Sequence, residues 1–395
     1  QMCIRDRNLT SIYTYLDVRF GKTAYRTGAS FFLLSKMLGA AARLYLVCLI
    51  LQNYVFGSMG VPFEITAAGT VSLIWLYTFR GGIKSLVWTD ALQTLCLITA
   101  LVLILYQLCC LNDFTVTEAI RHVTESPYGR WIEWDDWTSR QHFAKQFFSG
   151  VFIVIVMTGL DQDMMQKNLT CKNLRDAQKD MCSYGFSFIP LNMLFLGMGI
   201  LLLALASREG IALPVKGDDI LPLFCAEGYL GNEVLVLFTI GIIAAAFSSA
   251  DSALTALTTS FCVDILDVER RFARPEAVRK RVHGVIALLF VGFILCFEAV
   301  NDSSVIDAIY VVASYTYGPL LGLFAFGMFT RRKPWPAAVP WICVTAPVCC
   351  YLLDIWTASV YGYRFGYELL MLNGLFTFMG LYAFSKAYSP GMDKR

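Results

Sequence analysis

Charge is scarce in this sequence. Only 16% of its 395 residues are Asp, Glu, Lys or Arg, whereas 57% are hydrophobic and the mean hydropathy is +0.57. Soluble domains carry about 25% charged residues. The composition therefore excludes an ordinary soluble domain and predicts a polytopic membrane protein that lies in the lipid bilayer. The net charge of +2 gives no indication of a nucleic-acid partner.

Histidine is almost absent, and the cysteines form no recognisable motif. The three histidines, His122, His142 and His283, lie too far apart in the sequence to predict a metal cage, and the 13 cysteines include no CxxC pair. We expect no metal site built from histidine or cysteine, no disulfide framework, and cysteines that act as small apolar residues. Without a His cluster or an HExxH-like motif, a membrane enzyme is disfavoured.

Long apolar runs fill most of the chain. Ten of them are long enough to cross the hydrocarbon core as helices, which excludes a β-barrel with its short alternating strands. No linker or soluble domain separates them, so residues 8–395 read as a single membrane domain. The ten runs cover residues 27–55, 62–79, 85–110, 146–166, 183–206, 234–264, 282–300, 304–329, 337–357 and 365–386.

Basic residues alternate between the two sides of this topology. From residue 8 onward, the loops of one side hold 21 lysines and arginines, Lys167 among them, and those of the other side hold 7. Cytoplasmic loops carry the excess of basic residues. We therefore expect the first side, which includes both ends of this chain, to face the cytoplasm. We expect the protein to lie in the plasma membrane.

Two of the runs are interrupted. In 146–166 the apolar stretch meets "LDQD", and in 304–329 Gly318-Pro319 falls in mid-span. Proline lacks an N–H and its ring meets the preceding turn, so the second helix is predicted to kink. Broken helices at membrane depth are tolerated where they line a cavity, and they are typical of transporter binding sites. Packing kinks between helices are the competing interpretation.

The run 234–264 contains the polar stretch "AAAFSSADSALTALTTSF". Its small and hydroxyl residues fall on one helical face, a pattern that close helix packing also produces. Asp251 favours another interpretation, because a carboxylate at the centre of a span costs about 2.5–3.5 kcal/mol and needs a partner or water.

Asp90 is a second intramembrane acid, and only Lys36 and Arg43 are basic residues within spans. Oxygen-rich sites of this kind suit hard cations, and a proton is the competing ligand. The residues thus predict a cation-coupled transporter.

Four stretches resemble the sodium:solute symporter family. They are "YTFRGGIKSLVWTDALQT", "GLDQDMMQKNLTCKNLRDAQKDM", "AAAFSSADSALTALTTSFCVDIL" and "SYTYGPLLGLFAFGMFTRRK". The resemblance implies an all-α, leucine-transporter-like fold of two inverted five-helix repeats. It assigns the ten runs to core helices three to ten plus two trailing helices. The first three helices of the family pattern are then missing, residues 1–7 are expected to be an assembly artefact, and this chain by itself is expected not to transport.

The resemblance also implies the position of the principal sodium site. In this family the site uses carbonyls from core helix one and, from core helix eight, one carbonyl and two adjacent serines. The corresponding residues here are Ala245, Ser248 and Ser249.

A further cation site occurs in sialic acid transporters of the family, built from an acid on core helix five and hydroxyls on core helix eight. The corresponding residues here are Asp90, Asp251 and Ser252. The acid at Asp251 replaces the more usual serine, which either strengthens a second sodium site or makes it sensitive to protons.

The substrate cavity is expected between the broken sixth and the kinked tenth core helices. Its expected lining residues are Asp161, Gln162, Asp163, Ser314, Tyr315 and Tyr317. Phe188 stands where galactose transporters carry a lysine, which argues against a hexose. A sugar acid, a small carboxylate and a neutral polyol stay open, although the two aspartates disfavour an anion unless a cation offsets them.

The sequence therefore predicts a monomeric sodium-coupled symporter that imports a small polar solute by alternating access. The alternatives are a proton-coupled transporter of the same fold and a symporter-like sensor module. No soluble output domain follows the last span of this chain, which disfavours the sensor.

Overall fold

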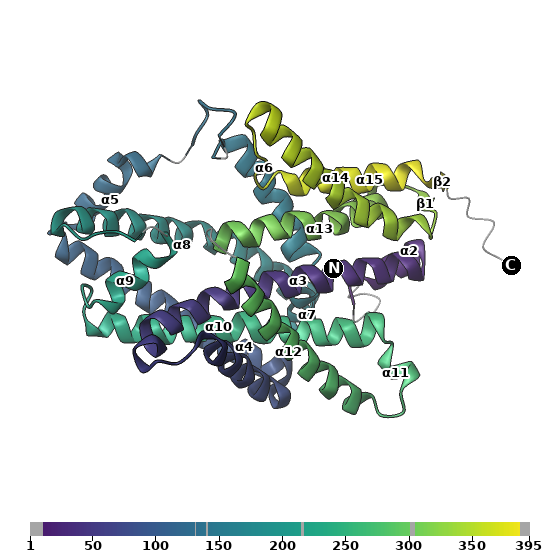
Figure 1. Ribbon diagram of the computed structural model, residues 1–395, viewed down its shortest axis with the longest axis horizontal. Coiled ribbons are helices and arrows are strands. Elements are labelled where there is room, and N and C mark those ends of the chain that lie inside the picture. The colour runs from purple at the N-terminus through teal and green to yellow at the C-terminus, as the bar shows by residue number, and fades with distance from the viewer. Residues whose placement is uncertain (1–10, 131, 140, 215–216, 301–304, 388–395) are drawn as a thin grey trace.

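The computed structural model describes residues 11–130, 132–139, 141–214, 217–300 and 305–387 (Figure 1). The predicted artefact at residues 1–7 lies outside these ranges. Helices make up nearly all of the described chain. They are α2 (Thr14–Phe20), α3 (Lys22–Leu51), α4 (Phe63–Leu111), α5 (Val116–Glu125), α6 (Phe143–Val154), α7 (Gln162–Thr170), α8 (Leu174–Glu209), α9 (Ile220–Ala226), α10 (Asn232–Ser260), α11 (Val268–Arg271), α12 (Pro275–Val300), α13 (Val305–Phe329), α14 (Ala338–Tyr361) and α15 (Leu369–Ala383).

Short segments of other geometry join these helices. The π-helical turns η1 (Gln52–Phe56), η4 (Ile155–Gly159) and η6 (Phe261–Ile265) follow α3, α6 and α10. The 3-10 turns are η2 (Gly57–Met59), η3 (Pro127–Gly129) and η5 (Gly217–Asp219). Strands β1 (Arg332–Pro334) and β2 (Ser385–Ala387) pair antiparallel, with Lys333 opposite Lys386, and tie the end of α13 to the chain after α15.

The ten predicted runs correspond to helical segments. Among the described residues, seven helices are long and apolar enough to span a membrane, and an eighth span is formed by the bent pair of Phe143–Gly159 and Gln162–Leu169. The run 365–386 corresponds to the shorter apolar helix Leu369–Ala383. The runs 62–79 and 85–110, predicted as separate spans, both fall within α4, a helix of 49 residues.

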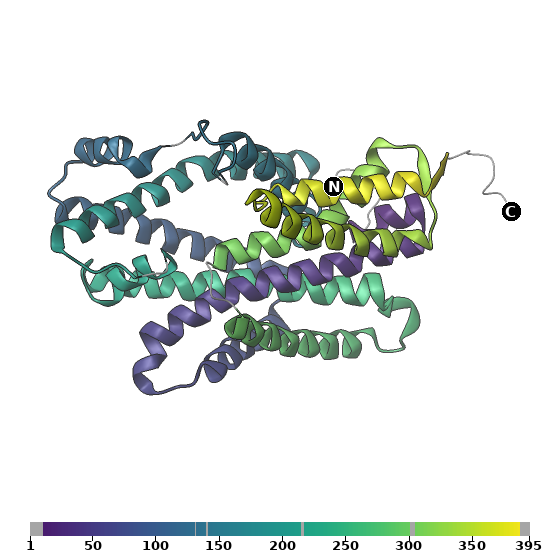
Figure 2. The same cartoon turned by 45° about the horizontal axis from the view of Figure 1, so that its top comes forward.

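Helix α3 lies at the centre of the molecule, between α13 and α10 (Figures 1 and 2). One apolar cluster joins α3 to α2, α13, α14 and α15, and a second joins it to α4, α10 and α12. Within an apolar stretch of 18 residues in each spanning helix, 72% of the α13 residues and 50% of the α3 residues are buried, whereas only 22% of the α8 residues are buried. The peripheral helices therefore present apolar faces outward, as expected where the surrounding solvent is lipid.

The two ends of the helix bundle differ. Helix α2, helix α11 and the β1–β2 pair gather at one end, while α5 and α9 lie at the opposite end (Figure 1). The first end therefore holds the basic segment around Arg270 and Arg271 and the pair Lys333 and Lys386. This gathering agrees with the division of basic loops read from the sequence.

Helix α13 passes through Pro319 without a break in the helix, and the kink predicted there stays a prediction. The missing proline N–H should free the carbonyl of Tyr315, four residues earlier. The amide of Asn373 on α15 donates to that carbonyl at 2.9 Å and to the Ser314 carbonyl at 3.0 Å. Gly318 makes this approach possible, because a Cβ on it would lie 2.3 Å from the Asn373 side chain. A neighbouring helix thus satisfies the backbone that Pro319 leaves open.

We expect Asn373→Ala to lower the free energy of unfolding by about 1–3 kcal/mol, because it leaves a buried carbonyl without a donor. Thermal unfolding in detergent measures the loss. Pro319→Ala in the same background restores a backbone N–H and should recover part of it. The control is Asn192→Ala, an exposed amide that bonds within its own helix. Equal losses in Asn373→Ala and Asn192→Ala would contradict this account of Pro319.

Candidate functional site

The break between α6 and α7 creates the first part of the site. The two helical segments meet at 58°. The carboxylate of Asp161 caps α7 by accepting from the Asp163 N–H at 2.8 Å, and the phenol of Tyr13 donates to the Leu160 carbonyl at 2.9 Å. The Gln162 side-chain oxygen accepts from the Ile12 N–H at 3.0 Å. Side chains therefore satisfy polar groups that a helix end leaves open inside the protein. The predicted break in this span is confirmed.

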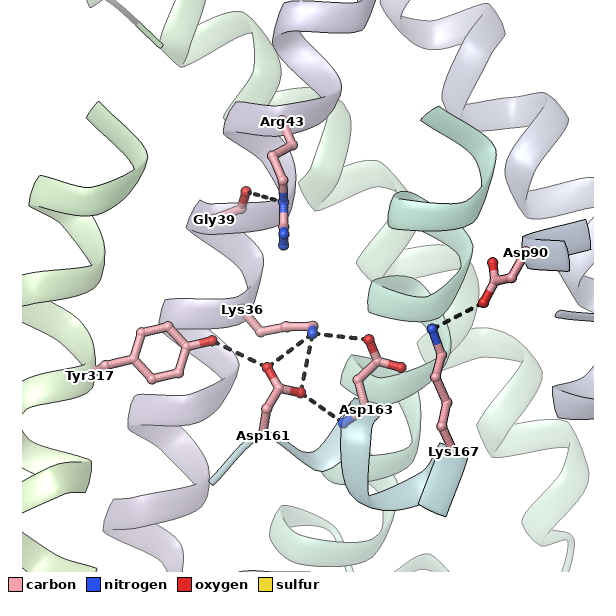
Figure 3. Close-up of polar contacts among 8 residues, drawn as sticks. All are labelled: Lys36, Gly39, Arg43, Asp90, Asp161, Asp163, Lys167 and Tyr317. Carbon is pink, nitrogen blue, oxygen red and sulfur yellow. Dashed lines mark hydrogen bonds and ion pairs between the residues drawn. The ribbon is translucent and has the colours of Figure 1, made fainter. Parts of the chain in front are cut away.

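A buried ion cluster surrounds this break (Figure 3). The Lys36 ammonium on α3 lies 3.1 and 3.0 Å from the two oxygens of Asp161 and 3.1 Å from Asp163. The side chains of Lys36 and Asp161 are only 8% and 3% exposed. The Tyr317 hydroxyl on α13 approaches Asp161 at 3.5 Å. Three helices thus converge on one charged group. The sequence analysis named Lys36 as a basic residue within a span, and the structure shows that these two aspartates are its partners.

Arg43 lies two helical turns from Lys36 on the same face of α3, above the ion cluster in Figure 3. Its Nε donates to the Gly39 carbonyl at 3.2 Å. A guanidinium has five N–H donors, and within the described part of the chain the others make no hydrogen bond. The half-buried guanidinium therefore has donors available at membrane depth.

A second polar group lies where α4 meets α10. The Asp90 carboxylate accepts a hydrogen bond from the Ser248 hydroxyl. Its other oxygen lies 3.1 Å from the ammonium of Lys167, a residue of α7. Lys167, which the charge pattern places in a cytoplasmic loop, thus reaches an intramembrane acid. The structure brings Asp90 and Ser248 together, although the sequence predicted them as members of two different cation sites.

Asp251 lies on the same α10 surface but has a different partner. One of its oxygens accepts from the Tyr77 hydroxyl on α4. Asp251 is fully buried, and its other oxygen has no hydrogen-bond partner in the described ranges. The neighbouring Ser252 is 3% exposed, and its hydroxyl likewise has no partner in those ranges. Two adjacent buried oxygens are therefore available to a cation or, at the carboxylate, to a proton.

The other predicted residues occupy less defined positions. Ala245 and Ser249 are half-buried on α10, and the Ser249 hydroxyl makes no hydrogen bond within the described segments. Ser314 is buried, with its carbonyl engaged by Asn373. The Tyr315 ring packs edge-on against Tyr351 of α14, with centroids 6.3 Å apart, whereas Tyr317 joins Asp161. Of the predicted cavity residues, Tyr317, Asp161 and Asp163 thus form one cluster, and the Tyr315 ring packs elsewhere.

Sequence reasoning missed the partners of these acids. Lys36 is a basic residue inside an apolar run, and that anomaly is the available signal. Lys167 and Tyr77 carry no such signal, because a lysine after a helix break and a tyrosine in a span are both common. A third contact of this kind lies where α10 ends, where Asp264 accepts from Tyr25 at 2.7 Å and from Ser260 at 2.5 Å.

The chain matches a known protein family over most of its length. The family described as "Sodium:solute symporter family" matches residues 4–338. This chain belongs to the sodium:solute symporter family. The sodium/sialic acid symporter of Aliivibrio fischeri is 26% identical over 341 residues, covering 83% of this chain and 65% of that protein. The sodium/sialic acid symporter of Proteus mirabilis is 26% identical over 354 residues, with coverages of 86% and 69%. The chain thus spans about two thirds of the length of these curated relatives.

The symporter fold is also found in a solved structure. It is described as the substrate-bound, outward-open state of a Na+-coupled sialic acid symporter with a novel Na+ site. The TM-score is 0.77 at 20% sequence identity, and the match covers 98% of this chain and 80% of that one. This similarity confirms the leucine-transporter-like, all-α fold. The family consists of multi-pass membrane transporters, and its matched members are not enzymes.

We expect Lys36→Met to destabilise this protein strongly, because it leaves two carboxylates in a buried site without their cation. Breaking a buried ion pair costs about 3–5 kcal/mol. The measurement is thermal or denaturant unfolding in detergent. Adding Asp161→Asn and Asp163→Asn to Lys36→Met should recover most of the loss. Lys22→Met, an exposed lysine on the same helix, is the matched control, and a similar loss there would show that the ion cluster is not the cause.

Proposed function

We propose that this protein is a sodium-coupled secondary active transporter that imports a small polar solute by alternating access. The observation that carries the proposal is the contact of Asp90 with Ser248, which sets a carboxylate and hydroxyls face to face between two spanning helices. Sodium is a hard cation that takes oxygen ligands, as calcium does. Family membership supports the same coupling ion.

The principal sodium site is proposed on α10, from the Ala245 carbonyl and the Ser248 and Ser249 hydroxyls. The half-buried Ser249 hydroxyl supports this assignment, because it makes no hydrogen bond within the described residues and has lone pairs to offer. Sodium bound there is expected to favour the outward-open state. Coupling then requires that this state also binds the solute more tightly.

A second cation site is proposed around Asp90, Asp251 and Ser252. Its support is two buried oxygens, one on Asp251 and one on Ser252, that have no hydrogen-bond partner among the residues that the structure describes. Leaving such groups unsatisfied is costly, whereas a bound cation satisfies both. A proton on Asp251 satisfies the carboxylate alone. Proton coupling through Asp251 is therefore the second candidate function, and it rests on the same orphan oxygen.

The proposed solute is a small organic anion such as a sugar acid. Lys36 already compensates one of the two negative charges that argued against an anion. Arg43, the other basic residue of this helix face, keeps guanidinium donors available above the cluster. A guanidinium binds a carboxylate through two parallel hydrogen bonds. Two relatives are named sodium/sialic acid symporters, and sialic acid is a carboxylate.

The proposed location is the plasma membrane, with both ends of this chain in the cytoplasm and the monomer as the functional unit. The support for the orientation is the excess of basic residues at the end that carries α2, α11 and the β1–β2 pair.

Sodium should stabilise the full-length protein in detergent. At 100 times its dissociation constant, a ligand contributes about 2.7 kcal/mol to the free energy of unfolding. We expect NaCl, but not choline chloride at equal ionic strength, to raise the melting temperature. Ser249→Ala and Asp90→Asn should each weaken this effect and the sodium dependence of radiolabelled solute uptake. Full sodium dependence in the double variant would refute the site assignment, and Thr345→Ala on α14 is the hydroxyl control.

Arg43→Gln should weaken binding of a carboxylate solute by about thirtyfold or more, because truncating one side of a buried charged pair costs 2–5 kcal/mol. Competition against sialic acid uptake, measured with a carboxylate solute and its neutral amide, separates charge recognition from general damage. Arg26→Gln, an exposed arginine on the same helix, is the control. If Arg43→Gln and Arg26→Gln bind the carboxylate equally well, Arg43 is not the anion anchor.

A further inference from the structure

Five charged side chains lie in one alternating series across the site. From α13 toward α4 they are Asp161, Lys36, Asp163, Lys167 and Asp90 (Figure 3). Ion pairs at 3.0–3.1 Å join Lys36 to both of its acids and Lys167 to Asp90. In Figure 3, Asp163 lies between the ammonium groups of Lys36 and Lys167, and it contacts Lys36 at 3.1 Å. With three acids and two bases, the ionised series carries one uncompensated negative charge.

The two ends of this series differ in exposure. The side chains of Lys36 and Asp161 are 8% and 3% exposed, whereas those of Lys167 and Asp90 are 33% and 28% exposed. A buried pair is costly to open. A pair exposed to this degree is screened and held much more weakly. The Lys167–Asp90 pair is therefore the exchangeable one.

A candidate second acceptor for Lys167 lies on its own helix. Asp163 precedes it by four residues, so both side chains lie on the same face of α7, with the acid on the N-terminal side, the favourable order for such a pair. The Lys167 ammonium can therefore bond across to α4 through Asp90 or back along α7 to Asp163. Only the first bond links the broken helix to the helix that carries the cation-site acid.

A sodium ion beside Ser248 would compete with Lys167 for Asp90. Sodium and the Lys167 ammonium would repel each other at Asp90, whereas at Asp163 the resident cation Lys36 contacts one carboxylate oxygen and is also bonded to Asp161. One added positive charge also makes the five-residue series neutral. Sodium entry thus has a direct electrostatic consequence for α7.

Resting on the proposed sodium coupling, we infer that Lys167 is a tethered cation that holds Asp90 in the absence of sodium and moves to Asp163 when sodium binds. The exchange releases α7 from α4 and transmits sodium binding to the broken helix beside the proposed solute site. Lys167 is in this sense a positioning residue that acts through Asp90.

The test uses the full-length protein in detergent, with NaCl titrated against choline chloride at constant ionic strength. The sodium half-saturation concentration comes from the melting temperature, and hydrogen–deuterium exchange of peptides covering residues 160–170 reports on α7. In the unmodified protein, sodium should raise exchange in α7. Lys167→Gln removes the competitor, so the sodium half-saturation concentration should fall by about three- to fivefold. In this variant, α7 should exchange without sodium as fast as it does in the sodium-bound unmodified protein.

Two further variants and a control keep the test decisive if Lys167→Gln folds poorly. Asp90→Asn should also free α7 in the absence of sodium, but with weaker sodium binding. Lys167→Arg keeps the charge and should keep the sodium-dependent exchange. Lys172→Gln, an exposed lysine just beyond α7, should behave like the unmodified protein.

The outcomes separate the two proposals. Failure of sodium to alter the unmodified protein overturns the proposed sodium coupling itself. A normal sodium response combined with unchanged half-saturation and unchanged α7 exchange in Lys167→Gln overturns the tethered-cation role alone.

Discussion

The interaction of Lys36 with Asp161 and Asp163 is the constraint on which the site depends. A membrane-spanning helix that breaks at depth exposes backbone groups, and here the residues at the break also bring two carboxylates into a buried site. Open backbone groups and buried carboxylates are both too costly in hydrocarbon unless they have polar partners. Lys36 comes from α3, the helix at the centre of the bundle, so the compensating charge also fixes α7 against the core.

The same physics explains why the polar residues form a graded series rather than isolated pairs. Close to α13, the charges are sheltered and bonded at about 3 Å, which favours a single arrangement. Toward α4 the side chains are more exposed, so solvent screens the ion pair and lowers the cost of exchanging its partners. A transporter needs both properties: a rigid element that keeps its shape and a neighbouring element whose partners change when an ion arrives.

Several features followed from local sequence alone. "LDQD" after an apolar run correctly predicted a broken span, because an N-capping aspartate and a polar first turn start a new helix. Pro319 was a weaker guide, since its freed carbonyl is satisfied by Asn373, a residue of another helix, and α13 continues. Lys167 was assigned to a loop because hydropathy gives no information about where a long flexible side chain ends.

The sequence by itself determined that the chain is a polytopic helical membrane protein, which family it belongs to, and which spans carry acids and hydroxyls. Scarce charge, long apolar runs and local breaks are properties of consecutive residues, so they are legible without a structure. The pairings were decided only by the tertiary structure. Which base meets Asp161 and which hydroxyl meets Asp90 depend on distances between helices that are remote in the sequence. The same distances set which oxygens of Asp251 and Ser252 lack a partner within the described chain, and they set the cost of burying each charge.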